Sequence, residues 1–175
     1  MPGGSGRYPD PGGAGATVSA SVTGSAATSI TVSGLDGNND GDYDIYVDLL
    51  AASATSTVLL SINGSTANLY HAWAQIVGAS TLTGARSNGT CQVGANLSTG
   101  QGTRGWIRLR SKTGGTSAVR GGTSSLSSDV GPTHYMGAIE YLDVTTNITS
   151  IGITAAANSL AVGSSIVIRK LGNTA

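Results

Sequence analysis

The chain has 175 residues, of which 39% are hydrophobic and 10% charged, and its nine acidic and nine basic side chains balance to a formal net charge of zero. This length suffices for one domain with its own core, and the neutral balance argues against a nucleic-acid or membrane-surface binder. Disorder is also a poor interpretation, because the apolar residues fall in short alternating runs. Cys91 is the only cysteine, which excludes a disulfide within the chain, and no run approaches the ~18 apolar residues of a membrane helix.

Residues 1–16 contain three of the four prolines and six of the 27 glycines, a mixture that favours neither helix nor strand. We interpret them as a flexible N-terminal arm, and residues 17–175 as one β-sandwich domain. Either the arm is a plain unstructured leader, or it becomes ordered on a neighbouring subunit, where Arg7 and Tyr8 would contact the partner. The arm lacks the apolar stretch of a signal peptide, so we expect the product to be made and kept in the cytoplasm or released by lysis.

From residue 17 onward, apolar residues alternating with polar ones predict β-strands. Turn residues separate these strands, as at Asn63-Gly64 and Asn88-Gly89, and no segment predicts a helix longer than a turn or two. Strands at such regular spacing predict an all-β fold, a jelly-roll-like antiparallel β sandwich. The nine predicted strands cover residues 17–22, 29–34, 43–50, 56–62, 70–79, 105–112, 137–144, 148–154 and 164–171.

The stretch "SGLDGNNDGDYDIYVDL", residues 33–49, has the spacing of a calcium-binding loop. Asp36, Asn38 and Asp40 fill the first, third and fifth ligand positions, and Asp48, one place beyond the twelfth, is the carboxylate nearest to the last ligand position. However, such a loop is normally flanked by two helices, whereas strands are predicted here, and Asp48 is too short to copy a bidentate Glu. These four residues are therefore weak metal candidates, and we expect no cofactor.

An Asx-rich turn is the favoured interpretation of the same stretch. In such a turn, Asp36 and Asp40 accept hydrogen bonds from backbone N–H groups, while Gly37 and Gly41 adopt positive φ. The turn then only starts the next strand.

Charged residues cluster on and next to two predicted strands: five of the nine acidic residues lie in 36–48 and five of the nine basic residues in 104–120. Period-2 alternation gives the first strand an acidic face opposite a core face. The acidic face carries Asp42, Asp44, Tyr46 and Asp48, and the core face carries Tyr43, Ile45, Val47 and Leu49. The second strand has a cationic face, which carries Arg104, Trp106, Arg108, Arg110 and Lys112, with Ile107 and Leu109 turned inward.

These cationic-strand residues are the predicted partner-binding residues. We favour pairing of the two strips, either across strands of one sheet or between an acidic strip on one subunit and a basic strip on another. An acidic surface on another protein is the second interpretation. A nucleic-acid backbone with bases stacked on Trp106 is the least favoured, because it needs a wider basic field.

The sequence lacks the motifs of a catalytic site. It contains no GxSxG, GxxxxGK, HExxH or CxxC pattern, and neither His71 nor His134 has the spacing of a metal clamp or a triad. We therefore expect the protein not to be an enzyme.

Three segments resemble small bacteriophage virion structural proteins. They are "ITVSGLDGNNDGDYDIYVDLL", with a GLDG turn before a Tyr-containing strand, "LLSINGSTANLY", with an Asn-Gly turn and a nearby Tyr, and "ITSIGIT" followed by "AVGSSIVIRKL", a terminal hairpin. The resemblance covers about residues 30–171. It implies a jelly-roll-like β sandwich on the particle surface, often trimeric, without catalytic residues.

Within that family, the resemblance leads us to expect a capsid decoration (cement) protein, located in the virion, that binds the major capsid protein through its arm and charged strands. The alternative is a tail-fibre or receptor-binding module for host glycans, with Tyr70, Trp73, Trp106 and Tyr135 as its platforms. We also expect a homo-oligomer, a trimer, that binds neither membrane nor nucleic acid.

Overall fold

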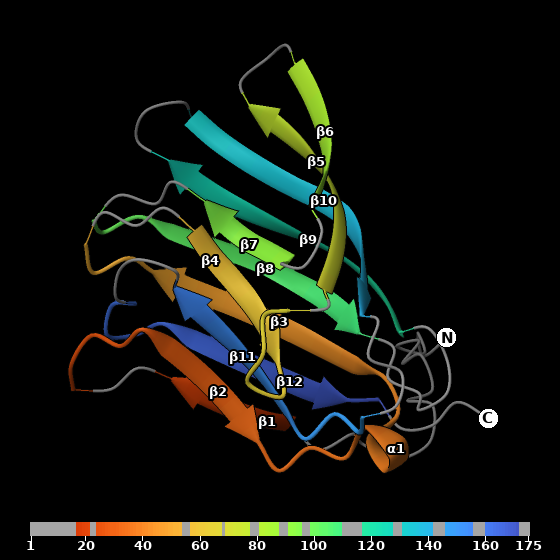
Figure 1. Ribbon diagram of the computed structural model, residues 1–175. Coiled ribbons are helices and arrows are strands. Elements are labelled where there is room, and N and C mark those ends of the chain that lie inside the picture. The colour runs from red at the N-terminus through yellow and green to blue at the C-terminus, as the bar shows by residue number, and fades with distance from the viewer. Residues whose placement is uncertain are drawn as a thin grey trace, which may run out of the picture.

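The computed structural model describes residues 17–21, 24–53, 57–67, 69–77, 81–87, 91–95, 99–109, 117–127, 131–141, 146–155 and 160–171. Within these ranges the chain forms strands and one short helix, α1 (Gly37–Asp40) (Figure 1). The strands are β1 (Thr17–Ser21), β2 (Ser29–Ser33), β3 (Tyr43–Leu50), β4 (Thr57–Ile62), β5 (Leu69–Val77), β6 (Thr81–Ser87), β7 (Cys91–Ala95), β8 (Gly102–Leu109), β9 (Ser117–Ser127), β10 (Gly131–Tyr141), β11 (Ser150–Ala155) and β12 (Ser165–Lys170). The predicted arm, residues 1–16, lies outside the described ranges.

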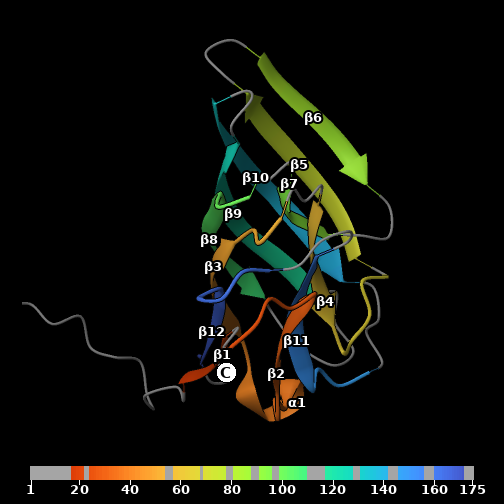
Figure 2. The same ribbon diagram turned by 90° about the vertical axis from the view of Figure 1, so that its left-hand side faces the viewer.

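The strands form two antiparallel sheets packed face to face (Figure 2). The larger sheet has the order β1-β12-β3-β8-β9-β10-β5-β6, and the smaller has the order β2-β11-β4-β7. When β5, β6, β9 and β10 are set aside, the remaining eight strands, renumbered along the chain, read 1-8-3-6 in one sheet and 2-7-4-5 in the other. This is the strand order of a jelly roll, with its two Greek keys. The predicted fold is confirmed.

Two insertions enlarge one sheet. β5 and β6 follow β4, β9 and β10 follow β8, and all four add to the same edge of the larger sheet, beyond β8. The larger sheet therefore extends past the smaller one where β5 and β6 lie (Figure 1), and β7 packs near β9, β10 and β5.

The core lies between the two sheets and follows from period-2 alternation. Along β3, the odd-numbered residues are buried, and Ile107 and Leu109 of β8 are buried beside them. In the smaller sheet, β2 shows the same alternation, with Ile30 and Val32 buried between exposed hydroxyl residues. In the described ranges, no helix is long and apolar enough to cross a membrane.

All nine predicted strands are present, and the sequence prediction missed three more. β6, β7 and β9 escaped because "TLTGARS", "CQVGA" and "SAVRGGTSSLS" are short in large apolar residues and lack clear alternation. The turn predicted at Asn63-Gly64 is confirmed, with φ values of 52° and 76°. The turn at Asn88-Gly89 lies outside the described residues.

Candidate functional site

The outer face of β3 and β8 holds the charged strips predicted from the sequence. The two strands are antiparallel neighbours, and their register sets Asp44 opposite Arg108 and Asp48 opposite Arg104. Between these pairs, Tyr46 lies opposite Trp106. Of the two favoured forms of pairing, within one sheet or between subunits, the pairing within one sheet is confirmed for both Arg–Asp pairs.

The Asp44–Arg108 pair is bidentate. Arg108 Nε donates to Asp44 Oδ1 at 2.7 Å, and Nη2 donates to Oδ2 at 2.9 Å. The Asp44 side chain is only 8% exposed, whereas that of Arg108 is 52% exposed. The hydrogen bond that Arg108 donates to Asp44 raises the pKa of Arg108, so this guanidinium remains charged. Arg108 thus neutralises a carboxylate that the sheet has largely removed from water.

The Asp48–Arg104 pair is more exposed. Arg104 Nε donates to Asp48 Oδ1 at 2.9 Å, and 79% of the Arg104 side chain is open to solvent. The hydrogen bond that Arg104 donates to Asp48 raises the pKa of Arg104. In water, such a pair contributes little to stability. Most of the Arg104 side chain surface is instead available to a partner.

Tyr46 and Trp106 lie between the two ion pairs, and each is 47% exposed. On one side, Tyr46 is the register partner of Val167 on β12, a half-buried residue. On the other side, Trp106 is the register partner of Gly122 on β9, which has no side chain to cover the indole. We call Tyr46, Trp106 and Val167 the aromatic patch. It is an apolar strip that crosses three strands on an open sheet face, and an Arg–Asp pair flanks it on each side along β3 and β8.

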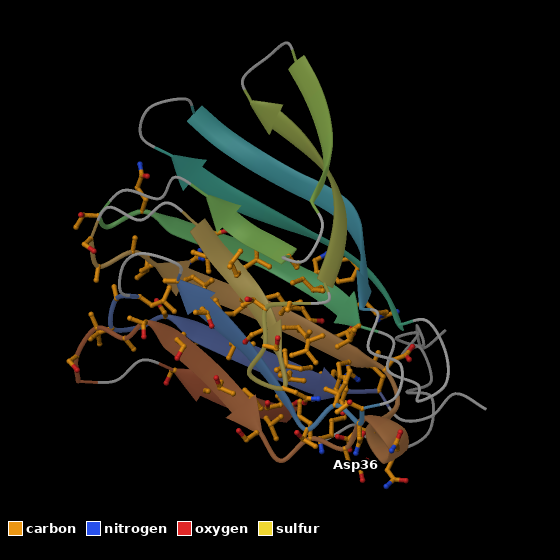
Figure 3. All side chains as sticks on the ribbon, in the orientation of Figure 1. Asp36 is labelled. Carbon is orange, nitrogen blue, oxygen red and sulfur yellow. The ribbon has the colours of Figure 1, made fainter. Side chains whose placement is uncertain are left out.

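The acidic turn before β3 is built on Asp36, which caps α1 (Figure 3). Its carboxylate accepts from the Asn38 N–H at 3.2 Å, Asn39 Nδ2 at 2.6 Å and Asn147 Nδ2 at 2.9 Å. The hydrogen bond from Asn147, followed by that from Asn39, lowers the pKa of Asp36. The carboxylate therefore joins the turn to the segment before β11.

Asp40 closes the other end of α1. Its carboxylate accepts from the Asp36 N–H at 2.8 Å, Tyr43 Oη at 2.9 Å and Lys170 Nζ at 2.8 Å. Burial opposes ionisation of Asp40, but these three donors outweigh it and hold the pKa of this carboxyl below its usual value. Burial, and then the hydrogen bond to Asp40, raises the pKa of Tyr43.

These contacts are those of an Asx-rich turn. Asp36 and Asp40 both accept backbone N–H bonds, as predicted, and Gly41 has a positive φ of 73°. The positive φ predicted for Gly37 is wrong, because this residue begins α1 and is helical.

The four weak metal candidates are not drawn into one cluster of free oxygen ligands. Protein donors bond both the Asp36 and Asp40 carboxylates, and Asp48 lies on β3, bonded to Arg104. Asn38 takes part through its backbone N–H, which donates to Asp36 and to Asn147 Oδ1 at 3.0 Å. Across the described part of the chain, no three His, Cys, Asp or Glu side chains form a group suited to a metal.

Arg7, Tyr8, Arg110 and Lys112 lie outside the described residues. β5 carries Tyr70, His71 and Trp73, and β10 carries His134 and Tyr135. For these two strands the structure describes the backbone and not the side chains. The sequence prediction missed Tyr46 as a site residue, although period-2 alternation had placed it on the outer face of its strand.

No family model matches the sequence, and no curated protein matches it. Among solved structures, a chain described as "Structure of infectious bursal disease virus Gt strain" aligns with 91% of this chain at 12% identity and a TM-score of 0.23. This chain spans 43% of the length of that viral chain. A likeness at this TM-score carries no argument about fold or function.

Proposed function

We propose that this chain is a structural protein of a virus particle, a phage capsid decoration protein that binds the major capsid protein through the outer face of β3 and β8. It would act in the virion after assembly in the host cytoplasm. The observation that carries the proposal is the aromatic patch: Tyr46 and Trp106 exposed side by side between two Arg–Asp pairs.

The composition of this face suits a protein partner. Tyr, Trp and Arg are the residue types enriched where single side chains dominate the energy of protein interfaces, and a polar rim commonly surrounds them. Here Trp106 and Tyr46 supply the apolar centre, and the charged pairs supply the rim. Because each Arg is already paired with an Asp, docking would bury neutralised pairs instead of single charges, which lowers the desolvation penalty.

Two broader features support the proposal. Jelly-roll sandwiches are common in viral capsid proteins, although they also occur in lectins, so the fold gives only an analogy. The sequence segments that resemble phage virion proteins include β3 itself, with its "GLDG" turn.

A glycan-binding tail module is the second candidate, and the same aromatic patch favours it. The face of a sugar ring can stack on Trp106, while paired guanidinium and carboxylate groups supply donors and acceptors for hydroxyl groups. The two candidates differ in the ligand that occupies one surface, so one experiment can separate them.

The test is co-sedimentation of the purified full chain with emptied capsids of the virus that encodes it, beside a glycan array. We expect saturable binding to capsids, a loss of at least tenfold in affinity for Trp106→Ala, and no change for Val162→Ala. Val162 is a matched control, because it is also an exposed apolar residue but lies in the turn before β12. Capsid binding that Trp106→Ala leaves intact would overturn the proposed site, and glycan binding without capsid binding would replace the proposed function.

The N-terminal arm, residues 1–16, which is predicted from the sequence alone, can be tested separately. Deletion of residues 1–16 should leave the β-type circular dichroism spectrum unchanged and weaken capsid binding. Equal binding by the full-length and truncated proteins would remove the arm from the proposal.

A further inference from the structure

The side of the sandwich farthest from the insertions ends in two edge strands, β1 in the larger sheet and β2 in the smaller (Figure 2). β2 pairs with β11 on one side, and within the described ranges no strand pairs with its other side. An edge of this kind presents backbone N–H and C=O groups that can pair with another chain.

Natural proteins protect such edges with charged side chains, proline or bulges. β2 has none of these: residues 12–35 contain no charged residue and no proline, and the pairing of β2 with β11 is in unbroken register. At the opposite side of the sandwich, the edge strands are β6 and β7, and both have a protecting feature. β6 contains Arg86, and the pairing of β7 with β4 is irregular, because its register shifts between Val58 and Leu59. The unprotected edge is therefore specific to one side of the molecule.

The sequence of β2, "SITVS", is symmetric in chemical character about Thr31. If two copies pair antiparallel about a twofold axis at this residue, Ser29 meets Ser33, Ile30 meets Val32, and Thr31 meets its own copy. Ile30 and Val32 are buried toward the core, whereas the three hydroxyl residues are exposed. The pairing therefore keeps apolar beside apolar and hydroxyl beside hydroxyl, a favourable cross-strand arrangement.

From this self-complementarity we infer that β2 is a self-association edge, where a second copy of the chain adds its own β2 in antiparallel register centred on Thr31. The smaller sheets of the two copies then become one continuous sheet across the dimer, and the β2 edge of each copy is covered. Five residues on each side form a small interface, so the dissociation constant should be on the order of micromolar. The trimer expected from the resemblance is the competing arrangement, and the test below distinguishes the two.

Sedimentation of the full chain over a range of concentrations tests this inference. We expect a reversible monomer–dimer equilibrium that Thr31→Lys abolishes, because the substitution sets two ammonium groups face to face at the axis. Thr99→Lys is the matched control, since Thr99 is an exposed threonine in a turn outside β2, and this variant should dimerise like the wild type. A chain that is monomeric at all concentrations, a trimer, or equal dimerisation by Thr31→Lys would each overturn the inference.

Cysteine cross-linking tests the register independently. Under mild oxidation, Thr31→Cys should form a disulfide-linked dimer, because directly opposed residues lie about 4.5–5.5 Å apart between their Cα atoms. Ser29→Cys should not, because the two copies of position 29 would be separated by about four residues along the strands, roughly 13 Å. The native Cys91 is fully buried and should not compete. Equal cross-linking at both positions would contradict the proposed register.

Discussion

Asp44 and Arg108 are 64 residues apart in the sequence and meet across β3 and β8 in a two-pronged ion pair. Because Asp44 is nearly buried, the pair is asymmetric: loss of the arginine leaves a carboxylate with little access to water. We expect Arg108→Met, which keeps the apolar stem, to lower the free energy of unfolding by about 1–3 kcal/mol. Arg104→Met should cost less, because its partner Asp48 is well exposed. Urea unfolding of both variants measures the difference, and equal losses would refute this asymmetry.

The carboxyl group of Asp40 makes stability depend on pH. Its pKa is lowered in the folded state, so the unfolded chain binds more protons between the folded pKa and the ordinary value of 3.8. The stability contributed by Asp40 is thus fully present above pH 3.8 and is lost as pH falls through the folded pKa. Asp36, whose pKa is also lowered, acts in the same direction.

Asp40→Asn tests this assignment. The variant should be less stable than the wild type at pH 6, because it loses the ion pair with Lys170. Its stability should also fall less steeply between pH 5 and pH 3. Urea unfolding at several pH values in this range gives the slope of stability against pH for the wild type and for the variant. Equal slopes would show that Asp40 is not responsible for the acid sensitivity.

Asn63 fastens the β4 turn to the segment before β11. Its Oδ1 accepts from the N–H groups of Thr149 at 2.8 Å and Ser150 at 3.2 Å, and its Nδ2 donates to the Asn147 carbonyl at 2.9 Å. Glycine at position 63 tolerates the left-handed φ but cannot make these hydrogen bonds. We therefore expect Asn63→Gly to lower the free energy of unfolding by about 1–3 kcal/mol. Asn63→Asp keeps the acceptor and should cost less. Thermal unfolding ranks the variants, and a neutral Asn63→Gly would mean that the clamp adds no stability.

Gly152 lets β2 and β4 approach β11 closely. A Cβ at this position would lie 2.8 Å from Thr31 Oγ1, 2.9 Å from the Ile30 carbonyl oxygen and 2.9 Å from Ser61 Oγ. Since one of these contacts is backbone, Gly152→Ala should destabilise the fold by about 1–3 kcal/mol. Addition of Ser61→Ala should recover part of this loss, and the double variant compared with each single variant in urea would show it. If the effects of Gly152→Ala and Ser61→Ala on the free energy of unfolding simply add, steric crowding between these two positions is contradicted.

Local alternation predicted much of this fold, because it depends only on neighbouring residues. It assigned Tyr43 and Ile45 to the core and Trp106 to the outer face, and all three assignments are confirmed. It could not give the register that joins Asp44 to Arg108, because nothing local specifies which distant strands pair. The same limit hid Tyr46, whose role depends on its neighbour across the sheet.

The turn before β3 shows a different limit. The asparagine and aspartate spacing predicted hydrogen bonds within the turn, which α1 confirms. The sequence could not show that Asn147, more than a hundred residues away, donates to Asp36, or that Lys170 pairs with Asp40. These distant donors are the main reason why the calcium-like spacing forms a structural turn.

The central claim, that the outer face of β3 and β8 attaches the protein to a virus shell, is tested most directly by an electron cryo-microscopy map of capsids saturated with the full chain. The account predicts density for this sandwich on the shell surface, with Tyr46 and Trp106 buried against the major capsid protein. Density in which these two side chains face solvent, or shells that carry no such density, would contradict it.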